Sequence, residues 1–82
     1  MSEIKFNLEE TLQTLEITMN KLAVQARLRP TTIVELTHGD SKAIKFDTLI
    51  KILDTLNYFA EEKRIERVFT IHDVIEYVPD SK

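Results

Sequence analysis

The sequence predicts a mainly helical, single-domain protein: a bundle of four to five short helices, with the two chain ends paired as a small two-stranded sheet. Apolar residues recur at helical spacing through most of the 82 residues. The chain holds one glycine and two prolines, so few positions break a helix. Hydrophobic residues make up 43% of the sequence, which is typical of a folded domain rather than a disordered tail.

The two ends of the chain are expected to be extended. Over residues 4–6, two apolar side chains flank a lysine, which is the alternation of a half-buried strand. Near the other end, residues 76–78 form a second short stretch of this kind, and Pro79 ends it. We expect these two stretches to pair as antiparallel strands beside the helices.

The first helix is predicted over residues 8–15, where three leucines fall at helical spacing. Asn7 is the expected N-cap. Glu9 and Glu10 stand in the first turn, where the positive end of the helix dipole favours acidic side chains.

Two shorter helices joined by a tight turn are predicted over residues 18–39. Thr18 is the expected N-cap of the first, and Gly39 is expected to end the second in the left-handed conformation. Each segment is too short to be stable alone, so they must pack together. The small Ala23 lets the two backbones approach, and Ile33 closes the angle between them. The apolar faces comprise Leu22, Ala23 and Ala26 in the first segment and Ile33, Val34 and Leu36 in the second.

A longer helix is predicted from Phe46 or Asp47 to Leu56. Its wide apolar face consists of Leu49, Ile50, Ile52, Leu53 and Leu56.

A further helix is predicted over residues 60–67, which are rich in helix formers. Ile65, Val68 and Phe69 would form one apolar edge. Thr70 and Asp73 have the spacing of a capping interaction for a last short helical turn.

Charge is distributed unevenly along the chain. The formal net charge is −3, which argues against an indiscriminate nucleic-acid binder. Residues 18–45 are nevertheless net basic, and both flanks are net acidic. One face can therefore meet phosphate while the rest repels it. The cations of this central segment are Lys21, Arg27, Arg29, Lys42 and Lys45, against Glu35 and Asp40.

Several functional classes are not expected. The chain has no cysteine, which excludes a disulfide framework and a cysteine-ligated zinc site. His38 and His72 lack the neighbours of a recognised metal spacing, so neither a metal nor another cofactor is expected. No Ser-His-acid order or Gly-rich phosphate loop indicates an enzyme. No apolar run suits a membrane span and no signal peptide is evident, so we expect a cytoplasmic protein.

The order of these features resembles the Cro and phage-repressor (lambda repressor-like) type of helix-turn-helix DNA-binding domain. The similarity is greatest to a compact bacterial and phage subgroup in which RP-x-TI opens the recognition helix and EYVPD closes the domain. Residues 29–33 and 76–80 carry these motifs here, and residues 58–69 stand as an insertion. The other matching features are Thr18, the Leu22-Ala23 and Thr32-Ile33 pairs, Gly39, and residues 46–57.

The resemblance implies that the second motif helix enters the major groove of double-stranded DNA while flanking residues hold phosphates. The base-reading candidates are then Arg29, Thr31, Thr32 and Glu35. The phosphate candidates are Thr18, Asn20, Lys21, His38, Ser41, Lys42 and Lys45. For Glu35 the alternative is a solvated helix face or an ion pair with Arg29. For each phosphate candidate, the alternative is an ordinary exposed polar residue.

The chain departs from the family pattern at three positions. Arg27 occupies a turn position where the family commonly has glycine, because the backbone there is left-handed. Met19 stands where the family often has glutamine, and we expect it to pack rather than to recognise DNA. Lys45 stands where the family often has an Asp or Ser cap, which makes Asp47 the alternative cap of the following helix.

The expected function is that of a sequence-specific transcriptional regulator of the phage or bacterial repressor type, which binds an operator as a homodimer. The alternative is a protein-interaction module, such as an anti-repressor or a repressor partner, that binds another regulatory protein. Residues 58–69 are the expected dimer surface, and packing of this segment back on the preceding helix is the alternative. The apolar residues it offers are Tyr58, Phe59, Ile65, Val68 and Phe69.

Overall fold

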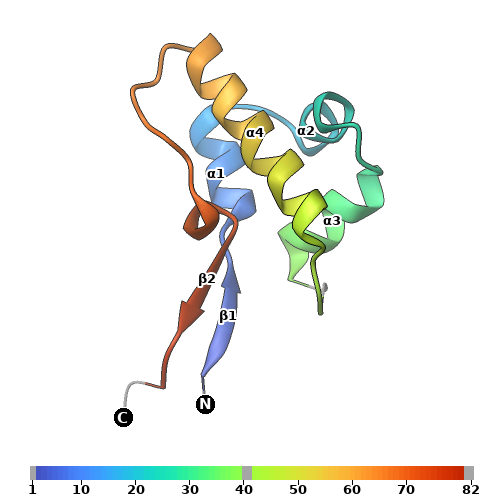
Figure 1. Cartoon of the computed structure of the whole chain (residues 1–82), viewed down its shortest axis with the longest axis vertical. Coiled ribbons are helices and arrows are strands. Elements are labelled where there is room, and N and C mark those ends of the chain that lie inside the picture. Colours follow the sequence, from blue (N-terminus) through green and yellow to red (C-terminus); the bar gives the residue numbers. More distant parts are fainter. Residues whose placement is uncertain (1, 40–41, 81–82) are drawn as a thin grey trace.

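The computed structural model describes residues 2–39 and 42–80. The described chain is mainly helical with one small sheet, as predicted (Figure 1). Its elements in order are β1 (Glu3–Phe6), α1 (Leu8–Leu15), α2 (Met19–Ala26), α3 (Pro30–His38), α4 (Phe46–Glu62), the 3-10 turn η1 (Ile71–Asp73) and β2 (Ile75–Val78). No helix among the described residues is long and apolar enough to cross a membrane.

The two strands pair antiparallel, as the sequence predicts, and form what we call the ribbon. Glu3 lies opposite Val78, and Phe6 lies opposite Ile75. The ribbon extends away from the helices (Figure 1). Its inner end adjoins α3, because a Cβ atom built on Gly39 would lie 3.5 Å from the Phe6 ring.

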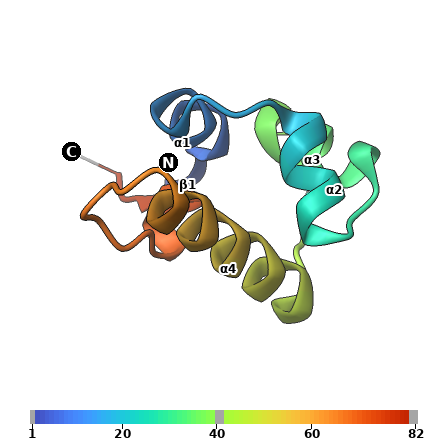
Figure 2. The same cartoon turned by 90° about the horizontal axis from the view of Figure 1, so that it is seen from above.

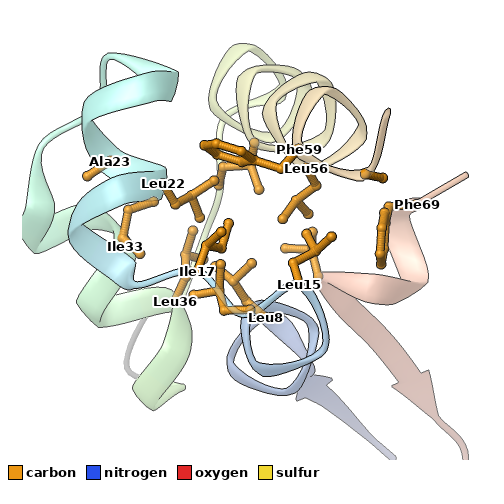
Figure 3. Close-up of a cluster of buried hydrophobic side chains, with 14 of the residues drawn as sticks. Leu8, Leu15, Ile17, Leu22, Ala23, Ile33, Leu36, Leu56, Phe59 and Phe69 are labelled. Atoms are coloured by element: carbon orange, nitrogen blue, oxygen red, sulfur yellow. The ribbon is translucent and has the colours of Figure 1, made fainter. Parts of the chain in front are cut away.

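The core is one apolar cluster to which every helix contributes. Seen from above, α4 lies along one side, with α1 and the α2–α3 pair opposite it (Figure 2). Leucine and isoleucine side chains from all four helices converge between them, and Phe69 closes the end near α1 (Figure 3). The fully buried members include Leu8, Leu15, Leu22, Ile33, Leu36, Ile52, Leu56, Phe59, Phe69 and Val74.

The start of α1 differs from the prediction. Asn7 occupies the N-cap position, but its side chain forms no capping hydrogen bond. Its Nδ2 instead donates to the His72 carbonyl and to Glu76 Oε1, both at 2.9 Å. Because the Asn7 backbone N–H also donates to Val74, this residue fastens β1 to the η1–β2 corner. Tertiary contacts with the far end of the chain therefore displaced the local cap.

The predicted helix over residues 60–67 is wrong. α4 continues to Glu62, and the chain then leaves the helix at a turn in which Arg64 is left-handed, with φ 58°. Beyond the turn, the side chain of Asn57 holds the backbone of Phe69, accepting from its N–H at 2.7 Å and donating to its carbonyl at 3.1 Å. The segment must double back on α4 to bury Phe69, and a straight helix cannot do this.

Two details of α4 were also predicted incorrectly. Lys45 is the N-cap and forms no side-chain capping bond, whereas Asp47 lies within the first turn. Ile50, expected on the apolar face, is 55% exposed, while Leu49, Ile52 and Leu56 are buried. The helix therefore buries a narrower stripe at its start than its composition suggests.

The segment after α4 is divided between core and surface. Phe69 is buried and Ile65 packs against the core, but Val68 is 77% exposed. The predicted capping interaction is present: Thr70 and Asp73 form a reciprocal capping box around η1. Arg67 reinforces this turn through an ion pair with Asp73.

Candidate nucleic-acid interface

The α2–α3 unit has the geometry of two short helices crossing over a tight turn. Ala23 and Ile33 are 1% and 0% exposed, so the small side chain and the branched one meet at the crossing as predicted (Figure 3). Arg27 ends α2 in the left-handed conformation, with φ 59° and ψ 43°. The next amide, of Leu28, donates back to the Ala23 carbonyl at 2.9 Å. A non-glycine residue in this conformation costs about 1 kcal/mol.

Most of the first turn of α3 is exposed to solvent. Arg29 is its N-cap, with an extended backbone that directs the chain away from the turn, and Pro30 supplies a φ already suited to a helix. Arg29, Thr31 and Glu35 are exposed, and Thr32 is half-buried. The predicted base-reading residues therefore share the outer side of one helix.

The Arg29 and Glu35 side chains form no hydrogen bond or ion pair with each other or elsewhere in the described part of the chain. The guanidinium keeps its five donors, and the carboxylate keeps its acceptors. The ion pair considered as the alternative role for Glu35 is therefore absent. Both charged groups are free to meet a ligand.

The start of α2 presents hydrogen-bond donors to the outside. Thr18 caps the helix by accepting from the Lys21 N–H at 3.0 Å, which confirms the predicted N-cap. No described hydrogen bond uses the N–H groups of Met19 and Asn20. Free N–H groups at the positive end of a helix dipole favour an anion such as phosphate.

A contact between Met19 and Thr37 joins the beginning of α2 to the end of α3. The Thr37 hydroxyl oxygen lies 3.2 Å from the Met19 sulfur. His38 follows directly and is exposed. Thr18 and Asn20 flank Met19 in the sequence, and His38 follows Thr37. The Met19–Thr37 contact therefore places these three predicted phosphate residues at one edge of the α2–α3 unit. The sequence predicted that Met19 packs.

The predicted lysines do not join this edge. The ammonium of Lys21 lies 5.3 Å from the centre of the Phe59 ring, so its side chain reaches across to α4. Lys42 lines a mainly apolar hollow beside Ile4 and Phe6 of the ribbon. Ser41 lies outside the described residues.

Lys45 instead belongs to a polar hollow between α3 and the start of α4. Thr32 and Glu35 line it from α3, and Lys45 and Thr48 line it from α4. Thr48 was not predicted as a functional residue. The available signal was its place in the first turn of a helix that follows a basic loop, where free N–H groups and a hydroxyl can both bind phosphate. No side chain caps this helix.

Comparison with known proteins adds one match. The family model of the Cro/C1-type HTH DNA-binding domain matches residues 7–58, more than half of the chain. The matched region begins directly after β1 and ends within α4, so both strands of the ribbon lie outside it. No curated protein and no solved structure gives a significant match.

Proposed function

Because the chain belongs to the Cro/C1-type helix-turn-helix DNA-binding family, we propose that it is a sequence-specific transcriptional regulator of the phage or bacterial repressor type. It binds an operator in double-stranded DNA as a homodimer. The observation that best supports this proposal is the start of α3, where the Arg29 and Thr31 side chains are exposed and have no partner in the described chain, and Thr32 beside them is half-buried.

Base reading is assigned to the outer side of α3. The N-terminal residues of a recognition helix are those that reach base edges in the major groove. Arg29 can donate two hydrogen bonds to a guanine, and Thr31 and Thr32 can contact a thymine methyl group or donate to phosphate. Glu35 can accept from the amino group of a cytosine. Its nearest polar surroundings include Lys45, which reduces the repulsion between the carboxylate and neighbouring phosphates.

Phosphate binding is assigned to two helix starts that flank α3. One comprises Thr18, the free N–H groups of α2, Asn20 and the adjoining His38. The other comprises Lys45 and Thr48 at the start of α4. Lys21 and Lys42 add to the basic character of this part of the sequence, and the Ser41 hydroxyl is a further candidate donor to phosphate. Contacts on both sides would fix the register of α3 in the groove without themselves reading sequence.

A homodimer is proposed because one short recognition helix discriminates weakly. Each good base contact supplies only about 1–3 kcal/mol, and helix-turn-helix dimers double this by binding two half-sites. In residues 58–69, Phe59 and Phe69 are used by the core, whereas Tyr58 and Val68 remain exposed for a partner. The subgroup assignment rests on the RP-x-TI and EYVPD motifs, the second of which lies in β2 and just beyond it.

The test begins with unbiased selection of bound DNA fragments, followed by titration on the selected site and on random DNA at several salt concentrations. Arg29→Ala should weaken binding to the selected site by roughly 5- to 150-fold, equivalent to about 1–3 kcal/mol. Arg29→Lys keeps the charge but loses the bidentate fork, so it should lose preference while retaining bulk DNA binding. Lys63→Ala, at the far end of α4, removes a cation away from the interface and serves as the control.

Equal losses by Arg29→Ala on selected and random DNA would contradict the base-reading role. Binding by the wild-type chain should weaken steeply as salt rises, because phosphate contacts release counterions. If the chain binds no DNA at low salt, the protein-interaction alternative takes precedence over the proposal.

A further inference from the structure

The ribbon is a second exposed feature, and its two strands lie outside the family-matched region. An isolated two-stranded sheet is only marginally stable in water. On one face, Phe6 and Ile75 at the inner end pack against the core. Ile4 and Tyr77 lie opposite each other at the outer end of the same face and are 49% and 62% exposed. The ribbon thus carries an apolar pair that the single chain leaves uncovered.

The alternation of hydrogen bonds shows which backbone groups of β1 are free. The Asn7 N–H donates to the Val74 carbonyl at 2.8 Å, so that pair is hydrogen-bonded. In an antiparallel ladder bonded and non-bonded pairs alternate, which makes Lys5 with Glu76 a bonded pair and Ile4 with Tyr77 a non-bonded one. The N–H and C=O of Ile4 therefore point away from β2, and no described hydrogen bond uses them.

The two outer edges of the ribbon are not equivalent. Pro79 directly follows β2 and lacks an N–H, which is one way in which proteins protect a strand edge from further pairing. The residues of β1 have no such block. A third strand would therefore add more readily to β1 than to β2.

We propose that the β1 edge is the homodimer surface, where β1 of a second copy pairs antiparallel with it about a two-fold axis through Ile4. The outward N–H and C=O of each Ile4 then bond to those of the other. This inference rests on the homodimer part of the proposed function. It assigns the dimer surface to the ribbon rather than to residues 58–69.

Charge complementarity favours this register. With Ile4 opposite Ile4, each Glu3 lies opposite Lys5 of the other copy, so opposite charges meet on both sides of the axis. Within each ribbon Lys5 already lies opposite Glu76. Signs therefore alternate across the polar face of the four-stranded sheet. A register centred on β2 residue Glu76 would instead place two glutamates opposite each other.

The apolar face is completed by the same register. Directly opposed residues share a face, so Tyr77 and Ile4 of one copy continue into Ile4 and Tyr77 of the other as one apolar row. Beside it, a mainly apolar hollow lined by Ile4, Phe6, Ile44 and Ile75 offers further area to the second copy. Strand pairing thus sets the register, and the row and the hollow supply apolar burial.

Ile4→Pro tests the edge because it removes an outward N–H and leaves the ladder between β1 and β2 intact. The wild-type chain should show a mass near twice 9.6 kDa by light scattering at high concentration. The proline variant should remain folded by circular dichroism but show half that mass. Ile4→Val keeps the N–H and should remain dimeric. A wild-type chain that is monomeric at every concentration, or a dimeric proline variant, overturns the inference.

A charge exchange covers the case in which the proline variant fails to fold. Glu3→Lys and Lys5→Glu each place like charges opposite each other in the homodimer, so each variant alone should dissociate at least tenfold more readily than the wild type. In an equimolar mixture every such pair is again of opposite sign, and a heterodimer should form. If mixing changes nothing, or if Ile65→Asp with Val68→Asp abolishes the dimer while both charge variants stay dimeric, the inference fails.

DNA binding separates this inference from the proposed function. A wild-type dimer that binds no DNA at low salt would refute the DNA-binding proposal and leave the dimer surface intact. A wild-type monomer that binds a selected site would refute the dimer surface and leave the DNA-binding proposal intact.

Discussion

Asn57→Ala should release the segment that follows α4. The Asn57 side chain accepts from the Phe69 N–H at 2.7 Å and donates to the carbonyl oxygens of Phe69 and Leu53 at 3.1 Å. It thereby fixes the backbone on either side of the Phe69 ring, which is 2% exposed. Removing the Asn57 amide does not change the Phe69 ring itself. The Phe69 backbone, however, loses the two hydrogen bonds that hold it in place.

The expected loss follows from these contacts. A typical intramolecular hydrogen bond contributes about 1 kcal/mol, so the two bonds to Phe69 contribute about 2 kcal/mol. A buried N–H left without a partner costs about 1–3 kcal/mol, which sets the upper part of the range. We therefore expect the free energy of unfolding to fall by about 2–4 kcal/mol. Each kcal/mol should lower the thermal midpoint by roughly 4–8 °C for a domain of this size.

Urea unfolding followed by circular dichroism measures this change, and hydrogen exchange at the Phe69 amide reports it locally. Asn57→Asp is the matched control, because it keeps the acceptor for the Phe69 N–H but loses both donor bonds, and it should fall between the wild type and the alanine variant. A loss below about 0.5 kcal/mol for Asn57→Ala, or unchanged exchange at the Phe69 amide, would refute the role given to this clamp.

The left-handed residues Arg27 and Gly39 give two opposed predictions. Arg27→Gly should raise the free energy of unfolding by about 0.5–1 kcal/mol, and Gly39→Ala should lower it by a similar amount. Glycine relieves the strain of the left-handed conformation, and the entropy that glycine gains in the unfolded chain offsets part of this effect. Chemical denaturation checks both, with Arg27→Ala as the control that keeps the strain; a gain with alanine equal to that with glycine would contradict the explanation. The Tyr58 hydroxyl donates to Glu62 at 3.0 Å, and this bond together with the carboxylate charge raises the pKa of Tyr58 above its usual value. The hydrogen bond is present at pH values below the usual pKa of tyrosine and is lost as pH rises through the raised pKa. Glu62→Gln, made in a Tyr77→Phe background, should therefore lower the pKa of Tyr58 measured by tyrosinate absorbance. An unchanged titration would exclude Glu62 as the cause.

The parts of the fold that the sequence predicted correctly are those in which neighbouring residues supply the decisive interaction. Thr18 caps α2 through an N–H three residues away, and Thr70 and Asp73 form their capping box over the same separation. Gly39 ends α3 because glycine tolerates a positive φ. The base-reading candidates lie together for the same reason, since a single helix positions them.

The errors occurred where a distant partner competes with the local preference. Asn7 would cap α1, but the far end of the chain offers its side chain two acceptors. Residues 60–67 have helical propensity, yet burial of Phe69 against α4 requires a turn at Arg64. The predicted phosphate residues also divide into separate groups, because Lys42 lies beside the ribbon and Lys45 lies at the start of α4.

The sequence by itself determined the class of fold, the two motif helices and the exposed face of α3, because helical spacing and caps act over three or four residues. Only the tertiary structure decided which polar groups remain without partners. Whether the amides at the start of α2, the charges of Arg29 and Glu35, and the backbone of Ile4 stay free depends on what the rest of the chain places beside them. That placement is set by the packing of the common core, and no local pattern encodes it.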